Sequence, residues 1–372
     1  MCPTPTGGRG SDLSILALET SCDDTCAAVL DADGRIRSSV ISSQEAHARF
    51  GGVVPEIASR HHLELVNAIV EQALERAGAT LEDVDLIAAT QGPGLVGALL
   101  VGLSTAKALA AARELPFAPV DHLQGHVAAN FLPGEQDRGS GRRSVPARAF
   151  EPPFVCLIAS GGHTLLALVS EHDGFEVLGR TLDDAAGEAF DKGARLLGLG
   201  YPGGAALERL ALDGDPDAFS FPGSPGERTR ARSPRSSGAR GKAFADGLDF
   251  SFAGVKTALL YAVRELGEDA ARERAADLAA SYQAAIVEQL IVRVRRALER
   301  TGIPRLAVGG GVAANGHLRL RLRELDAAVH VPARSLCTDN AAMIASAARF
   351  REPLPYPRYL GLDAYASGES RR

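Results

Sequence analysis

Two histidines four residues apart, His122 and His126, are the first side chains in the sequence that suggest chemistry. In a helix, this spacing places both imidazoles on one face with Cβ atoms about 5–6 Å apart, so two ring nitrogens can share one metal ion. Histidine is the commonest metal ligand, but two of them do not complete a site. The alternative interpretation is a pair of polar residues at a solvated helix start.

A third ligand is predicted at Asp339, at the start of the last helical segment. Two imidazoles and one carboxylate form an open-faced set that suits Fe(II), and Zn(II) is also compatible. The competing interpretation is that Thr338 or Asp339 is the N-cap of this helix. Glu19 ends an apolar strand, where a buried charge is costly, so we expect it to lie near a cation or a phosphate.

Two glycine-rich turns have the composition of anion-binding sites. Residues 160–162 lie between two apolar segments, and their backbone N–H groups can approach a phosphate without a Cβ in the way. A plain hairpin turn explains the same residues. Residues 309–311 follow a predicted strand and precede Asn315, as at a nucleotide site, although close helix–strand packing explains them equally well.

Acidic residues crowd the segment that begins at Asp183. Asp184, Glu188 and Asp191 are three or four residues apart and are expected to share one helical face. They are interpreted either as a solvated acidic helix start or as acceptors for the hydroxyls of a ribose or substrate.

The elements expected to position these residues occur twice in the same order. A strand hairpin with a polar turn is predicted at 15–30 and again at 154–169, and a strand, glycine turn and helix at 87–110 and again at 306–322. This repetition predicts an α/β protein made of duplicated domains flanking a central cleft. By fold-level analogy, it resembles the actin, heat-shock-70 and sugar-kinase superfamily.

We expect an N-terminal domain at residues 13–121, completed by a C-terminal helix at 338–350, and a C-terminal domain at 122–337. Low-complexity insertions are predicted near 133–152 and 223–247. The second insertion is rich in arginine and is expected to be disordered. It is interpreted as a solvated surface loop or, alternatively, as a segment that contacts nucleic-acid phosphates.

The bulk composition is that of an ordinary soluble globular protein, with 372 residues, 45% hydrophobic and 23% charged. The net charge of -6 argues against a globally basic nucleic-acid binder, without excluding a local basic patch. Five scattered cysteines without a C-x-x-C pair favour a reducing compartment. Because there is neither a signal peptide nor an apolar run of about 18 residues, we predict a cytoplasmic protein without a membrane partner.

Taken together, the motifs resemble those of one family, the tRNA N6-adenosine threonylcarbamoyltransferases (TsaD), formerly described as O-sialoglycoprotein endopeptidases. The resemblance covers about residues 15–343. The matching motifs include Glu-Thr-Ser-Cys-Asp-Asp-Thr at 19–25, the histidine pair, Ser-Gly-Gly-His-Thr at 160–164, and the segments at 51–60, 91–99, 183–192, 201–204, 249–257, 309–315 and 337–344.

The resemblance implies metal ligands at His122, His126 and Asp339. It also implies substrate contacts at Ile158, Ala159, Ser160, Gly161, Gly162, Asp191, Gly204 and Asn315. Members move a threonylcarbamoyl group from threonylcarbamoyl-adenylate to the N6 amine of the adenosine 3′ of the anticodon, in tRNAs that read codons beginning with adenine, and release AMP. Bacterial members act with an inactive paralogue (TsaB) and a small ATPase (TsaE).

Acyl transfer from a mixed anhydride already has a good leaving group, so we expect no nucleophile from the protein. The expected catalytic set is His122, His126, Asp339 and Glu19, with one divalent ion, Fe(II) or Zn(II), polarising the carbonyl. Glu19, Asp23 and water all stay open as the general base.

Three other functions compete with this one. A zincin-type peptidase would have a glutamate directly after the first histidine, but Leu123 stands there. A small-molecule kinase could use Asp23, Asp24 or Asp191, but it would leave the histidine pair unexplained. A non-catalytic paralogue would be expected to lack the pair.

Overall fold

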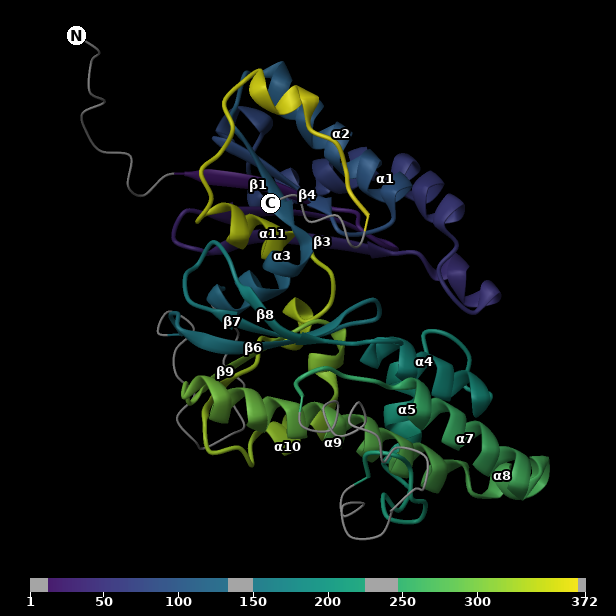
Figure 1. Cartoon of the computed structure of the whole chain (residues 1–372). Helices are drawn as coiled ribbons and strands as arrows, with labels where there is room; N and C mark the ends of the chain where they lie inside the picture. Colours follow the sequence, from purple (N-terminus) through teal and green to yellow (C-terminus); the bar gives the residue numbers. More distant parts are fainter. Residues whose placement is uncertain (1–12, 133–149, 225–246, 367–372) are drawn as a thin grey trace.

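The structure, a computed structural model, describes residues 13–132, 150–224 and 247–366. Two five-stranded sheets lie one above the other, with helices on their outer faces and between them (Figure 1). The insertions predicted near 133–152 and 223–247 lie almost entirely outside the described residues. No helix in the described part of the chain is long and apolar enough to cross a membrane.

The first sheet has the strand order β3-β2-β1-β4-β5, in which β1 pairs antiparallel with β2 and parallel with β4. Its side chains alternate between two faces. Leu16 and Leu18 face α1 (Pro55–Ala77) and α2 (Val96–Ala112), whereas Ile15 and Ala17 face α11 (Ala341–Ala348). The strands are β1 Ser14–Glu19, β2 Asp24–Asp31, β3 Ile36–Ser43, β4 Leu86–Gly92 and β5 Phe117–Asp121.

The second sheet repeats this topology, with the order β8-β7-β6-β9-β10. Here β6 pairs antiparallel with β7 and parallel with β9. The duplicated α/β fold predicted from the repeated pattern is therefore confirmed. The strands are β6 Phe154–Ala159, β7 Thr164–Val169, β8 Glu176–Arg180, β9 Arg305–Gly309 and β10 Ala328–His330.

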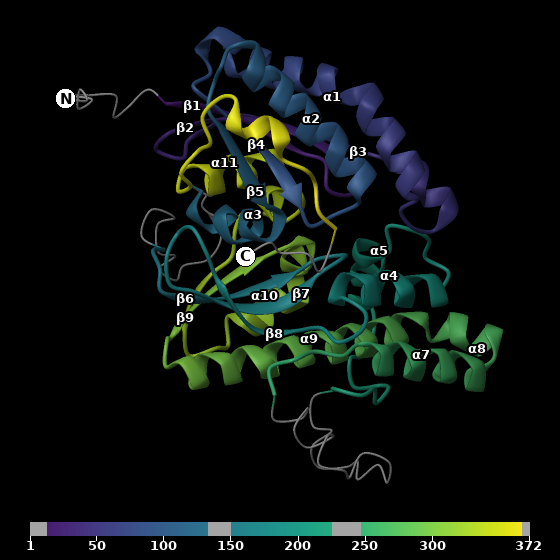
Figure 2. The ribbon, with the colours of Figure 1, turned by 45° about the horizontal axis from the view of Figure 1, so that its top comes forward.

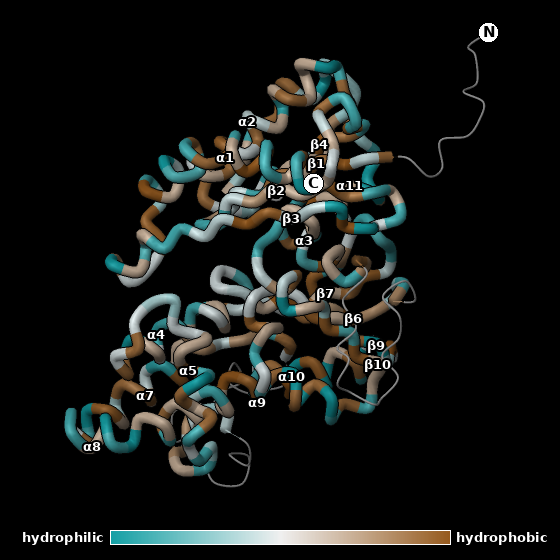
Figure 3. The backbone as a smooth tube through the Cα atoms, turned by 180° about the vertical axis from the view of Figure 1, so that it is seen from behind, coloured by the Kyte–Doolittle hydropathy of each residue, from teal (hydrophilic) through white to brown (hydrophobic). Residues whose placement is uncertain are grey.

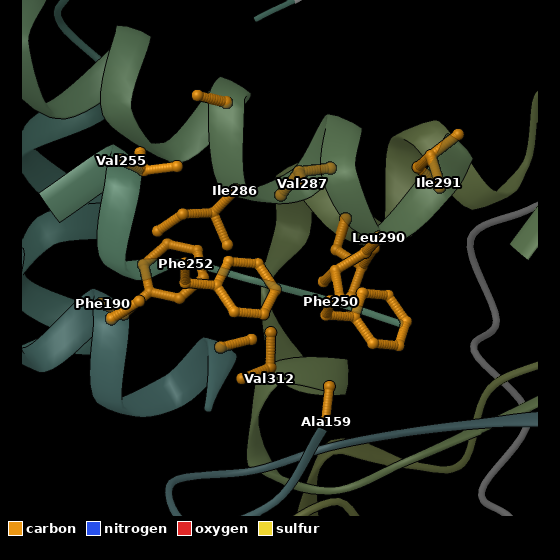
Figure 4. Close-up of a cluster of buried hydrophobic side chains, with 14 of the residues drawn as sticks. Ala159, Phe190, Phe250, Phe252, Val255, Ile286, Val287, Leu290, Ile291 and Val312 are labelled. Carbon is orange, nitrogen blue, oxygen red and sulfur yellow. The ribbon is translucent and has the colours of Figure 1, made fainter. Parts of the chain in front are cut away.

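Helices and two aromatic side chains cover the outer face of the second sheet. Phe250 and Phe252 stack with ring centroids 6.1 Å apart and pack with Ile286 and Leu290 of the long helix α9 (Figure 4). The α8 helix at the far end is largely hydrophilic (Figure 3). The helices here are α4 Ala186–Leu196, α5 Gly204–Ala211, α7 Ala253–Leu266, α8 Glu268–Glu273, α9 Ala275–Thr301 and α10 Gly316–Leu322.

Two short helices, α3 (His122–Ala128) and α11, lie between the sheets and pack against each other (Figure 2). One buried apolar cluster includes both helices and the inner side chains of both sheets, such as Ala17 of β1 and Ile158 of β6. The inner faces of the sheets are thus joined through one core. The domain boundary between residues 121 and 122 stays a prediction.

Candidate active site

The histidine pair lies at the start of α3, where the first sheet meets the second. Asp121 ends β5 and caps the helix, because its Oδ1 accepts hydrogen bonds from the backbone N–H groups of Leu123 (2.8 Å) and Gln124 (3.1 Å). One helical turn then separates His122 from His126, and their ring centroids lie 4.7 Å apart. Both side chains are buried, so the interpretation as solvated helix-start residues is wrong.

Asp339 lies opposite the two imidazoles. Its Oδ1 is 3.3 Å from His126 Nε2 and 3.6 Å from His122 Nε2. The predicted N-cap, Thr338 or Asp339, is wrong: Asn340 caps α11, accepting a hydrogen bond from Met343 N–H at 2.9 Å. Because Asn340 takes the capping role, the Asp339 carboxylate faces the histidines.

These three side chains fit a metal ion. One potential ligand atom from each lies within 4.8 Å of the others. Both Nε2 atoms approach the same carboxylate oxygen, and neither ring nitrogen of the buried His126 makes a hydrogen bond of good geometry within the described residues. A buried imidazole without a hydrogen bond is costly, and coordination would satisfy it.

Glu19 contacts His122 on the ring nitrogen that faces away from Asp339. Its Oε2 lies 3.0 Å from His122 Nδ1 and accepts from the Thr90 hydroxyl, while Oε1 accepts from Ser21 N–H. A carboxylate on the second ring nitrogen fixes the orientation of a metal-ligating imidazole. Burial raises the pKa of Glu19, but His122 and Thr90 outweigh burial, so the net pKa is lowered. The catalytic role expected for Glu19 stays a prediction, and the observed contact is with the His122 ring.

The electrostatics of His122 follow from the two carboxylates beside it. Burial lowers the pKa of His122. The negative charges of Asp339 and Glu19 raise it by more than burial lowers it, so the net pKa is raised to about 9. The raised pKa favours the protonated imidazole at neutral pH, so metal binding here would be coupled to loss of a proton.

The predicted phosphate-binding turn joins β6 to β7. Ile158 and Ala159 end β6 and are buried, whereas Gly161 and Gly162 are exposed, and an added Cβ at either glycine would meet nothing within 4 Å. Gly187 of α4 packs directly on this turn, since a Cβ there would lie 2.6 Å from the carbonyl oxygen of Ser160. The turn thus presents open backbone beside the first turn of α4.

The other predicted substrate residues are engaged in local contacts. Asp191 Oδ1 accepts from Gly203 N–H (2.8 Å) and Gly204 N–H (3.1 Å), which ties α4 to the start of α5. Asn315 caps α10 by accepting from Leu318 N–H, and its amide donates to Gln283 at 2.7 Å. Between the end of β9 and the start of α10, residues 311–314 form a short 3-10 turn.

The acidic segment does not form one helical face, because α4 begins only at Ala186. Asp184 precedes it and pairs with Lys192 (2.7 Å) and Lys256 (3.4 Å). Glu188 also pairs with Lys192, at 2.9 Å. Asp184 and Glu188 thus take part in a local ion-pair network, and their role as acceptors for hydroxyls stays a prediction.

Sequence reasoning missed His163, which follows the two glycines of the β6–β7 turn. Its ring centroid lies 6.4 Å from that of His122. Burial, together with the nearby His122 and His126, lowers the pKa of His163 to about 4. Its position directly after Gly162, in a turn predicted to bind phosphate, is the signal in the sequence that could have made it a candidate.

Comparison with known proteins identifies relatives over most of the chain. Residues 35–346 match the TsaD family, tRNA N6-adenosine threonylcarbamoyltransferase. A tRNA N6-adenosine threonylcarbamoyltransferase of Pelobacter propionicus is 48% identical over 336 residues, 89% of this chain and 90% of that protein. Its counterpart in Syntrophobacter fumaroxidans is 49% identical over 347 residues, 90% of this chain and 93% of that protein.

Solved structures resemble the chain at the level of the fold. HypF of T. kodakarensis superposes with a TM-score of 0.55 at 13% identity, covering 91% of this chain and 47% of HypF. Component A of (R)-2-hydroxyglutaryl-CoA dehydratase from Acidaminococcus fermentans superposes with a TM-score of 0.51 at 14% identity, covering 94% and 99% of the two chains.

Proposed function

Because the chain belongs to the TsaD family of tRNA N6-adenosine threonylcarbamoyltransferases, we propose that it transfers a threonylcarbamoyl group to the N6 amine of a tRNA adenosine. The observation that carries the proposal is the family match over 35–346, joined to a buried His122–His126–Asp339 group. The donor is threonylcarbamoyl-adenylate and AMP leaves. The acceptor is the adenosine 3′ of the anticodon in tRNAs that read codons beginning with adenine.

In this proposal, His122, His126 and Asp339 hold one divalent ion, Fe(II) or, as the alternative, Zn(II). When bound, the ion supplies Lewis-acid polarisation of a carbonyl group. Glu19 keeps His122 in the ligating orientation. Both Glu19 oxygens are engaged by Ser21, Thr90 and His122, which argues against Glu19 as the general base and leaves Asp23 or water.

The β6–β7 turn is the proposed binding site for the adenylate phosphate. Its exposed backbone at Gly161 and Gly162 leaves room for close approach, and α4 begins beside it. Asp191 and Asn315 support the proposed substrate-binding region by fixing the starts of α5 and α10. Holding the donor near the incoming amine then contributes through positioning.

We further propose that the chain acts with a TsaB-like inactive paralogue and a TsaE-like ATPase, as the family resemblance implies. A tRNA substrate is also consistent with the cytoplasmic location predicted from the sequence.

The test is a transfer assay with purified protein, preformed threonylcarbamoyl-adenylate and unmodified tRNA, with and without both partners. Modified nucleoside is detected by mass spectrometry and bound metal by elemental analysis. We expect His122→Ala to lose both metal and product, and His61→Ala, on the outer helix α1, to keep both. Full activity of metal-free His122→Ala would contradict the metal assignment. ATP consumption with a small molecule and no tRNA product would favour a kinase.

A further inference from the structure

The last described residues, 351–366, form a C-terminal strap along the edge of the first sheet (Figure 1). Leu354 exchanges two backbone hydrogen bonds with Phe117 of the edge strand β5, at 2.9 and 2.8 Å. Tyr359 is fully buried against the Phe117 ring, with centroids 5.3 Å apart. Lys107 of α2 donates to the carbonyls of Leu360 and Leu362. The strap is therefore anchored along its length.

The end of the strap is fitted to the loop that follows β4. Tyr365 N–H donates to the Gln91 carbonyl at 3.2 Å, and the Gln91 amide donates to the Asp363 carbonyl at 2.8 Å. A Cβ at Gly92 would lie 2.4 Å from the Tyr365 carbonyl oxygen and 2.8 Å from its ring. Only glycine at position 92 leaves room for Tyr365 in this place.

The Tyr365 hydroxyl donates to Asp121 Oδ2 at 2.6 Å. The other oxygen of the same carboxylate caps α3, the helix that begins at His122. A short hydrogen bond to a charged acceptor is among the stronger ones, and here it restricts rotation of the capping carboxylate. A continuous series of contacts thus joins the strap to the metal ligands.

We infer that Tyr365 is a positioning residue for the metal site, acting through Asp121 on the orientation of α3 and its two histidines. The inference rests on the proposed metal site and extends it to a residue beyond the 35–346 match. Loss of the hydroxyl leaves the Asp121 carboxylate held only by the two capping bonds to its Oδ1, so α3 starts less rigidly and the ligands are less well placed.

The test is a cobalt(II) titration of metal-free full-length protein, followed by visible absorption. Removing an outer partner of a metal ligand costs about 10–100-fold in affinity. Tyr365 does not contact a metal ligand directly and acts only through Asp121. We therefore expect Tyr365→Phe to bind cobalt about threefold to tenfold more weakly, with an altered spectrum. The control is Tyr356→Phe on the same strap, which should match the wild type. Activity of Tyr365→Phe should recover at saturating metal.

A double mutant tests whether the effect passes through Asp121. In an Asp121→Ala background, which removes every side-chain partner of the Tyr365 hydroxyl at this position, Tyr365→Phe should cause little further loss. Unchanged cobalt affinity in Tyr365→Phe, an equal loss in Tyr356→Phe, or an undiminished loss in the Asp121→Ala background would each overturn the inference. If instead wild type and His122→Ala bind cobalt equally, the proposed metal site itself fails.

Discussion

Asn340 links the start of α11 to the Asp339 carboxylate, and its replacement by alanine gives a prediction with a definite size. Its Oδ1 caps the helix through Met343 N–H, and its amide donates to the Thr338 carbonyl at 2.8 Å. Loss of an N-cap costs about 1 kcal/mol. Loss of one further buried hydrogen bond costs about 1 kcal/mol. The contact with the Leu336 carbonyl, at 3.5 Å, is too long to add much.

We therefore expect Asn340→Ala to lower the free energy of unfolding by about 2 kcal/mol and to weaken cobalt binding about tenfold, because Asp339 loses its fixed neighbour. Asn315 is a matched control: it is also a buried N-cap whose amide makes one further hydrogen bond. Asn315→Ala should cost about the same stability and leave cobalt affinity unchanged.

Stability is measured by urea unfolding, monitored by circular dichroism. Metal affinity is measured by cobalt titration of the metal-free variants. Equal cobalt affinities for Asn340→Ala and Asn315→Ala would refute the reasoning, because they would show that Asp339 holds its place without the cap.

Three other outcomes follow from the described contacts. Gly187→Ala should lower the free energy of unfolding by about 1–3 kcal/mol through overpacking. Gly161→Ala, with open space for its Cβ, should leave the free energy of unfolding nearly unchanged, and urea denaturation of both variants measures the difference. Glu19→Gln should weaken cobalt affinity of the site by about tenfold, and unaltered affinity would show that the contact with His122 does not matter. Burial lowers the pKa of His330 to about 4, from 6.5. The unfolded chain therefore binds more protons between these values, and stability present above pH 6.5 is lost as the pH falls toward 4. His330→Phe should reduce this acid loss by about 2–3 kcal/mol, measured by urea denaturation at pH 4.5 and 7.5; an unchanged loss would contradict the assignment.

Local sequence signals predicted most of the fold. Alternating and helical apolar spacing, together with turn residues, located the strands of both hairpins, and Gly78 ends α1 in the left-handed conformation, as a C-cap glycine should. The repeat was visible because β1–β2 with β4 and β6–β7 with β9 have the same order. Register and the joining of both inner faces into one core depend on contacts between distant segments, which spacing does not encode.

The site was predicted in part. The spacing of His122 and His126 was sufficient to suggest that they share one metal ion, and Asp339 was a candidate by residue type. The choice of N-cap among Thr338, Asp339 and Asn340 was not decided locally, because all three residue types can cap a helix. The tertiary contact of Asp339 with the imidazoles decides it. The role of Glu19 likewise depends on a partner about a hundred residues away.

The position of α11 has a consequence for biosynthesis. The first sheet is complete in sequence once β5 ends at Asp121, but the helix that covers its inner face begins only at Ala341. At the usual 5–20 residues per second, a ribosome needs roughly 10–40 s to make the intervening chain. During that time the inner side chains of β1, β2 and β4 have no α11 to cover them. Closure of this core by α11 therefore comes only after the whole second sheet has been synthesised.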